Sequence, residues 1–200
     1  MEQANPFSDF SSYPHLQRQI AATNQSVFRQ LHTYYYRRLY HFAFSMVKTR
    51  EAAEEIIEDV FIRIWQQRSQ IIEIRNLRVY LYTAVKNGSL NFLATKAKEN
   101  LTESFDHLDI ECQAGSDPEQ LLITTEMFNR IQQAVDALPP RCKMIFKLIR
   151  EDGLKYKEVA EILHISVNTI DAQMAIAVSR IAAALKSDFG LGVRNRTVAG

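Results

Sequence analysis

The segment between residues 156 and 174 has the residue types and spacing needed to read the edges of DNA bases. A small residue, Ala160, allows a short first helix to approach a second one closely. His164 lies at a predicted tight turn, Ser166 follows as a helix cap, and Ile170 buries the second helix. The spacing from Ala160 through His164 to Ile170 is that of a helix-turn-helix.

In such a motif the first turns of the second helix enter the major groove. Asn and Gln side chains can pair there with adenine, Asp with cytosine, and Thr with the methyl group of thymine. The candidates for base contact are Ser166, Val167, Asn168, Thr169, Asp171, Ala172 and Gln173. The candidates for phosphate contact are Arg141, Lys155 and Lys157.

The same spacing also fits a plain antiparallel pair of helices that packs on another surface. Glycine is the usual residue at the turn, and His164 accepts a left-handed conformation there at some cost in energy. No Lys or Arg occurs between Lys157 and Arg180. Because phosphate neutralisation supplies much of the affinity for DNA, we expect this segment alone to bind DNA weakly.

Composition indicates that helices position these residues. The chain has 200 residues, of which 46% are hydrophobic and 24% charged, with only 6 Gly and 5 Pro. So few helix breakers favour long helices over a turn-rich β fold. The predicted fold class is all-α, with two small helical bundles joined by a flexible acidic linker and the helix-turn-helix in the second bundle.

Apolar periodicity places three helices in the first bundle, which we predict to span residues 25–98. The helices cover about 28–46 and 53–65 and then continue from Leu77, with a loop at 66–76. Residues 1–24, which are polar and contain two prolines, are expected to be a mobile leader that gains helix near its end.

A change in charge marks the boundary between the bundles. The segment from Glu99 to Asn129 contains eight Asp and Glu residues but no Lys or Arg. Residues 99–116 are therefore the predicted linker, followed by a domain at 117–187 and a tail at 188–200. Ser116 through Glu119 has the pattern of a helix start.

The sequence contains no signal for a metal site, a disulfide framework or catalysis. The formal net charge is only +1, and the two cysteines, Cys112 and Cys142, have neither metal-site nor disulfide-framework spacing. We therefore expect no metal, no cofactor and a reduced cytoplasmic environment. No uninterrupted apolar run approaches the roughly 18 residues that a membrane span needs, so we also expect no membrane insertion. No nucleophile–base set or glycine-rich phosphate loop indicates catalysis, so we expect no enzyme.

Taken together, the modules resemble the extracytoplasmic-function (ECF) sigma factors from about residue 28 to residue 185. Four segments carry the resemblance in order and spacing: AEEIIEDVFIRIW at 53–65, RVYLYTAVKN at 78–87, LPPRCKMIFKL at 138–148 and LKYKEVAEILHISVNTIDAQM at 154–174. The first two look like region 2 of that family, and the last two look like region 4.

The resemblance implies a bacterial cytoplasmic factor that binds core RNA polymerase and directs it to promoter DNA. The first bundle would dock on the β′ clamp helices through Glu54, Glu55, Glu58, Asp59 and Arg63. The loop 66–76 and the following helix would bind the −10 element and capture a base out of the stack. Candidates for that role are Arg75, Asn76, Arg78, Tyr80, Lys86, Asn87 and Asn91.

The second bundle, by the same resemblance, would read the −35 element and contact the β flap, while the linker runs toward the RNA exit path. An anti-sigma factor is an expected further partner. This chain is poorer in cations than the family pattern, with Ala175, Ile176 and Ser179 where basic residues are usual.

Two other functions remain open at this point. One is a sigma-like protein that binds polymerase or a regulator but has weakened promoter recognition. The other is a stand-alone repressor, which leaves the first bundle without a role. Phe61 and Trp65 fit either a core or a partner hot spot, and the cluster from Tyr34 to Arg38 fits either bundle packing or nucleic-acid contact.

Overall fold

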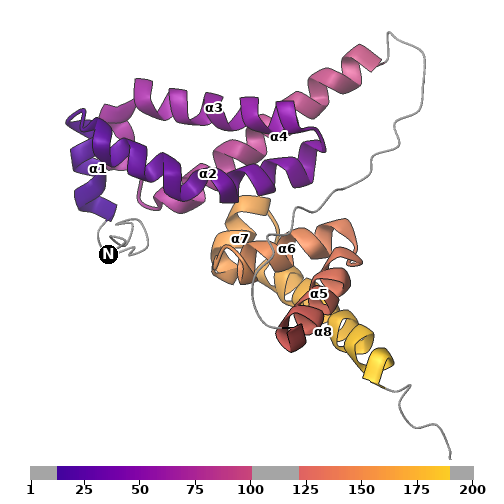
Figure 1. Cartoon of the computed structure of the whole chain (residues 1–200). Helices are drawn as coiled ribbons and strands as arrows, with labels where there is room; N and C mark the ends of the chain where they lie inside the picture. The colour runs from indigo at the N-terminus through magenta and orange to yellow at the C-terminus, as the bar shows by residue number, and fades with distance from the viewer. Residues whose placement is uncertain (1–12, 101–121, 190–200) are drawn as a thin grey trace, which may run out of the picture. The chain divides into compact units, whose positions relative to one another are not determined.

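The computed structural model describes residues 13–100 and 122–189, and all regular structure in these ranges is helical (Figure 1). The chain divides into two compact units, one that holds the helices up to residue 100 and one that holds the helices from residue 122 onward apart from Glu161–Leu163. The predicted all-α fold class is therefore confirmed. Each unit is described by itself.

The first unit is built around its second helix. Its elements are α1 (Tyr13–Ala21), α2 (Gln25–Val47), α3 (Arg50–Gln66), the 3-10 helix η3 (Arg68–Glu73) and α4 (Leu77–Asn100). Helix α2 packs against both α3 and α4, and α1 packs against η3. The largest fully buried side chains here are Ile20, Leu31, Tyr35, Leu39, Ile57, Ile71, Leu77, Leu81 and Tyr82.

Local signals set both ends of α2. The side chain of Asn24 accepts hydrogen bonds from the backbone N–H groups of Ser26 at 3.1 Å and Val27 at 3.2 Å, which satisfies two otherwise unpaired donors. At the other end Lys48 has a left-handed backbone, with φ of 62°, and its N–H donates to the carbonyl of Phe44. These caps fix where α2 meets its neighbours.

Packing explains the aromatic residues of this unit for which the sequence allowed either a core role or a contact with a partner or nucleic acid. Phe61 is buried, and Trp65, at the end of the same helix, is half-buried with its ring 4.9 Å from that of Phe28. Tyr35 is buried, while the guanidinium of Arg38 lies 4.4 Å from the ring centre of Tyr34. Bundle packing therefore accounts for Phe61 and Tyr35.

The predicted gain of helix near the end of the N-terminal segment is present, but this helix packs in the first unit instead of lying outside the bundle. Residues 13–21 form α1, and Tyr13, Leu16 and Ile20 are buried in the first unit. These residues follow helical spacing, but a pattern of only nine residues gives a weak signal in sequence. The predicted loop 66–76 also contains η3, because Ile71 is anchored in the core with 2% of its surface exposed.

The second unit comprises α5 (Leu122–Asp136), α6 (Pro140–Arg150), α7 (Tyr156–Leu163) and α8 (Val167–Phe189). Helices α5 and α6 both pack against α8. Val135, Leu138, Cys142 and Ala177 form a buried cluster on which Phe146 and Ile181 pack. The thiol of Cys142 donates a hydrogen bond to the carbonyl of Gln173 at 3.2 Å, and burial raises the pKa of this thiol.

The predicted boundaries compare with the structure as follows. Helix α4 ends at Asn100 and so includes the start of the predicted linker, 99–116. Helix α8 ends at Phe189 and so includes the start of the predicted tail, 188–200. The rest of the linker, the predicted helix start at 116–119 and residues 190–200 lie outside the described residues.

Two negative findings apply to the described residues only. Within 13–100 and 122–189, no helix is long and apolar enough to cross a membrane. In the same ranges, no group of three or more His, Cys, Asp and Glu side chains is arranged to hold a metal ion.

One histidine is expected to make the stability of the first unit depend on pH. The ring of His32 lies between those of Phe61 and Tyr36, at 4.6 and 5.1 Å, and burial lowers its pKa below 6.5, an effect that Glu58 partly offsets. The unfolded chain therefore binds this proton more tightly than the folded chain. We expect the free energy of unfolding to fall as pH drops from about 6.5 toward the lower folded-state pKa.

Urea unfolding at pH 7.5 and 5.5 measures this effect. His32→Gln should reduce the difference between the two midpoints by more than the same substitution at exposed His15. An equal reduction in both variants would exclude His32 as the source of the pH dependence.

Candidate functional site

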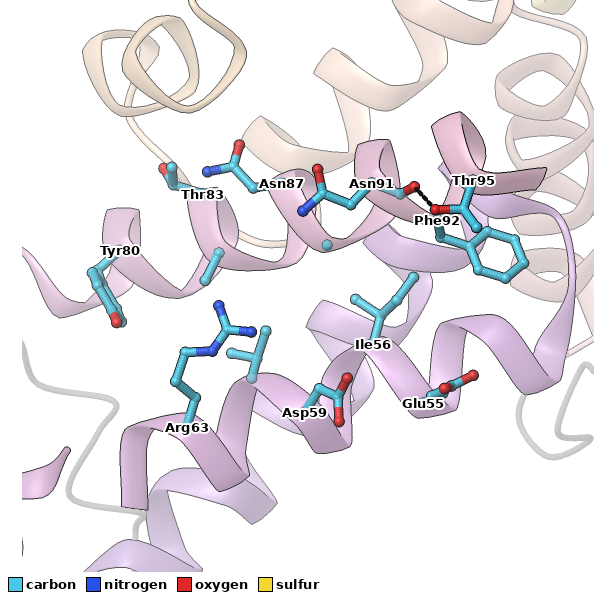
Figure 2. A pocket seen from close by; sticks show the side chains of 13 residues that line it. Glu55, Ile56, Asp59, Arg63, Tyr80, Thr83, Asn87, Asn91, Phe92 and Thr95 are labelled. Carbon is cyan, nitrogen blue, oxygen red and sulfur yellow. Dashed lines mark hydrogen bonds between the residues drawn. The ribbon is translucent and has the colours of Figure 1, made fainter. Parts of the chain in front are cut away.

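A groove of about 450 Å³ lies between α3 and α4 in the first unit (Figure 2). The α3 wall presents Glu55, Asp59 and Arg63, and the α4 wall presents Asn87 and Asn91 across from them (Figure 2). The remaining lining residues are Ile56, Val60, Tyr80, Thr83, Ala84, Gly88, Phe92 and Thr95. The groove thus joins members of two predicted sets, one for polymerase and one for −10 DNA.

Helices α3 and α4 approach each other closely at Gly88, which lines this groove. A Cβ atom placed there would lie 2.9 Å from Cγ2 of Ile56 on α3, closer than such atoms pack. The glycine costs some helix stability but lets the two backbones come together. A larger residue at this position would have to displace Ile56.

The predicted polymerase-binding residues share one exposed side of α3. Glu55, Glu58, Asp59 and Arg63 are exposed, while Glu54 is half-exposed and forms an ion pair with Arg50 at 2.8 Å. Positions three and four residues apart lie on the same side of a helix. This side therefore offers concentrated negative charge to a basic partner.

The seven predicted −10 residues do not share one surface. Arg75, Asn76, Asn87 and Asn91 are exposed and Tyr80 is half-buried, but Arg78 and Lys86 are only 5% and 6% exposed. The Oδ1 atom of Asn76 accepts a hydrogen bond from the N–H of Val79 at 3.1 Å, so it also caps α4.

Arg78 and Lys86 lie on the core side of α4. Arg78 is near the phenols of Tyr13 and Tyr35, which hydrogen-bond to each other. Burial raises the pKa of Tyr13 to about 12 and also raises that of Tyr35, so both phenols stay neutral. Burial lowers the pKa of Lys86. Packing therefore keeps both cations away from the exposed side of α4.

A second, smaller cavity of about 180 Å³ lies at η3 and the start of α4. Ile64, Ile71 and Ile74 supply apolar walls, and polar groups come from Gln67, Gln70, Glu73 and Tyr80. Of these polar residues, Tyr80 is among the predicted −10 residues, whereas Gln67 and Gln70 are not, because no periodicity indicates which loop side chains converge. The segment QQRSQ does place amides close to the predicted −10 residues.

The predicted turn of the helix-turn-helix is present in the second unit. His164 is left-handed with φ of 53°, and the N–H of Ile165 donates to the carbonyl of Ala160 at 3.1 Å. The hydroxyl of Ser166 accepts a hydrogen bond from the N–H of Thr169 at 3.0 Å. Ser166 is therefore the N-cap of α8, as its position in the sequence predicts.

The predicted base-contacting residues mostly project from the first turns of α8. Ser166, Val167, Asn168, Asp171 and Ala172 are exposed, and Thr169 and Gln173 are half-buried. The hydroxyl of Thr169 lies 2.8 Å from that of Ser166, so capping engages both. The phosphate-contact candidates Arg141, Lys155 and Lys157 are also exposed.

The cap is expected to contribute measurably to stability. Ser166→Ala removes the acceptor for the Thr169 N–H and should lower the free energy of unfolding by about 1 kcal/mol. Denaturant unfolding measures this, with Ser179→Ala as the control, since that serine is exposed farther along α8. Equal destabilisation by both substitutions would contradict the assignment of the cap.

Comparison with known families defines the class of protein. Residues 31–99 match the model described as Sigma-70 region 2, and residues 128–181 match the model described as Sigma-70, region 4. The first match contains α3, η3 and α4, and the second contains the helix-turn-helix. The molecule is therefore a sigma factor of the sigma-70 class.

Individual relatives narrow the class to a family. The chain is 24% identical over 164 residues to "ECF RNA polymerase sigma factor SigW" of Bacillus subtilis, covering 78% of this chain and 88% of that protein. It is 22% identical over 127 residues to the Escherichia coli "ECF RNA polymerase sigma-E factor", covering 60% of this chain and 66% of that protein. The chain belongs to the ECF family of RNA polymerase sigma factors, which direct promoter-specific initiation of transcription.

Solved structures agree on the fold. CnrH in complex with the cytosolic domain of CnrY is similar over 88% of this chain and 99% of that one, with a TM-score of 0.53 and 17% identity. The sigma factor RpoE in complex with the anti-sigma factor NepR from Bartonella quintana is similar over 80% of this chain and 98% of that one, with a TM-score of 0.61 and 20% identity. Sigma factors are transcription regulators rather than enzymes.

Proposed function

We propose that the exposed side of α3 is the surface that docks on the β′ clamp helices of core polymerase. Glu54, Glu55, Glu58 and Asp59 gather negative charge there, and Arg63 completes the set. Complementary charge speeds association and fixes the register of an interface. In domain terms, residues 25–98 together with α1 act as the polymerase and −10 module.

The −10 element is proposed to bind at η3 and the exposed side of α4. The small cavity has apolar walls, two glutamine amides and the Tyr80 ring, a combination that suits a base taken out of the stack. Arg75 and Asn76 at the start of α4 and Asn87 and Asn91 farther along would contact the strand. The buried Arg78 and Lys86 act instead through the packing of α4.

The −35 element is proposed to bind at the N-terminal half of α8. Asn168, Asp171 and Ala172 are exposed where a recognition helix meets base edges, and Arg141, Lys155 and Lys157 would contact phosphates. The domain at 117–187 would also contact the β flap, while the acidic linker runs toward the RNA exit path. Tethering both modules on polymerase compensates for the small number of cations on α8.

The place of action is proposed to be the bacterial cytoplasm, where core polymerase is available. An anti-sigma factor is a proposed regulator, because one similar solved structure holds the sigma factor RpoE with the anti-sigma factor NepR, and another holds CnrH with the cytosolic domain of CnrY. Copurification from the source organism, with mass spectrometry of the bound proteins, tests this directly.

The observation that carries this proposal is that one chain holds both a region 2 unit with an acidic α3 and a region 4 unit with an exposed recognition helix. The test is in vitro transcription by core polymerase, with and without the protein, on pooled upstream fragments of its own genome. New transcripts that share two spaced upstream motifs are expected. Binding to core without transcripts would favour a sigma-like protein with weakened promoter recognition.

A further inference from the structure

A buried glutamine of α1 holds the backbone of the segment proposed to bind the −10 element. Gln17 is 4% exposed, although it is a polar residue on a short N-terminal helix. Its Nε2 atom donates to the carbonyl of Ile71 at 2.7 Å and to that of Ile74 at 2.8 Å. The contact joins residues that are more than fifty positions apart in the sequence.

The chemistry of a primary amide suits this bridge. The amide nitrogen carries two N–H donors, and both are used on two carbonyl groups of the same turn. The carbonyl of Ile71 also accepts from the N–H of Ile74 at 3.2 Å, so Gln17 closes a small network at the end of η3. A side chain without these donors would take one partner from the carbonyl of Ile74 and leave the carbonyl of Ile71 with the Ile74 N–H alone, which disfavours this backbone conformation.

A second contact holds the other end of the same segment. The Nε atom of Arg68, at the start of η3, donates to the hydroxyl of Thr23 at 3.1 Å. Thr23 has a left-handed backbone, with φ of 66°, in the turn between α1 and α2. Arg68 also donates to the carbonyl of Trp65 at 3.0 Å and lies over its ring. Helix α1 and its following turn therefore contact η3 at both ends.

The held segment forms most of the small cavity. Gln70, Ile71, Glu73 and Ile74 line it, and Ile71 and Ile74 are the two residues whose carbonyls bond to Gln17. We propose that α1 is a brace for the −10 recognition segment and that Gln17 is its positioning residue, which sets the shape of the cavity and hence the choice of base. This inference rests on the function proposed above.

The test compares Gln17→Met, which keeps the length of the side chain and removes its donors, with two controls. Gln19→Met makes the same change on α1, where Gln19 hydrogen-bonds only to His15 and Asn24 in the contacts described. Ile57→Val removes one buried methylene from α3 and destabilises the unit without changing the contacts of Gln17.

Two readouts separate positioning from general stability. Hydrogen exchange of the 68–74 amides should become about tenfold faster in Gln17→Met, with α2 and α4 unchanged. Emission from Trp65, the single tryptophan of the chain, should shift in the same variant, because it contacts Arg68. In holoenzyme, the ratio of transcription from the cognate promoter to that from single-base −10 variants should move toward equality. Both controls should keep the wild-type ratio.

The outcomes distinguish this inference from the proposal on which it rests. If wild-type protein directs no transcription with core polymerase, the proposed function fails, and the exchange and emission measurements still test the brace. If wild type is active and Gln17→Met keeps both slow exchange in 68–74 and the wild-type −10 selectivity, the positioning role is overturned. The same conclusion follows if Ile57→Val lowers selectivity as much as Gln17→Met.

Discussion

Lysine in place of both Glu55 and Asp59 is expected to weaken binding of the protein to core RNA polymerase by about 100-fold or more. Both carboxylates are exposed on the proposed docking side of α3 and line its groove (Figure 2). Reversing them turns attraction to a basic partner into repulsion. Fluorescence anisotropy of the labelled protein titrated with core polymerase measures the change.

The fold should tolerate this double substitution. Glu55 and Asp59 are four residues apart, so one like-charged pair replaces another. The new repulsion between Arg63 and the lysine introduced four residues before it costs only a few tenths of a kcal/mol. The control is Glu151→Lys with Glu161→Lys, two exposed carboxylates that lie at the end of α6 and on α7, with the same change in net charge. Equal weakening by both variants would show a nonspecific charge effect and contradict a docking site on α3.

Asn168→Ala is expected to relax base selectivity in the −35 element at one position. Asn168 is exposed in the first turn of α8, and an asparagine can make a bidentate contact to adenine in the major groove. Losing such a contact costs about 1–3 kcal/mol of discrimination, whereas losing a phosphate contact weakens binding to all sequences alike. Transcription from promoters randomised in the −35 element, followed by sequencing, measures the change.

A matched variant keeps this prediction specific. Asn129→Ala makes the same change at an exposed position of α5 and should leave the −35 preference intact. Lys157→Ala should lower transcription from all promoters and reduce its salt dependence. The assignment of α8 would be wrong if Asn168→Ala lowered transcription uniformly, with no change in preference at any base pair.

The helix-turn-helix was predictable because its signals are local. A cap at Ser166, an apolar contact at Ile170 and a residue that tolerates a left-handed turn at His164 lie within a few residues of one another, and the structure has all three. The exposed acidic side of α3 was predictable for the same reason, since helical periodicity alone separates its buried and exposed positions.

The residues around the proposed −10 site were predicted less completely. Arg78 and Lys86 have the residue type expected at a DNA surface, yet packing around α4 buries both. Their orientation depends on which sides of α4 the neighbouring helices cover, and α2 and α3 both pack against it. Residue type cannot supply that information. The convergence of Gln67, Gln70 and Tyr80 on one cavity also depends on the path of η3 in space.

By itself the sequence determined the all-α class, the order of the two modules, the recognition helix and the charge of α3, because caps, turns and periodicity act between near neighbours. Only the tertiary structure decided that α1 belongs to the first unit and that Gln17 bonds to Ile71 and Ile74. It also decided which cations of α4 are buried. These features depend on contacts between segments far apart in the chain, and no local sequence pattern indicates which distant segments come into contact.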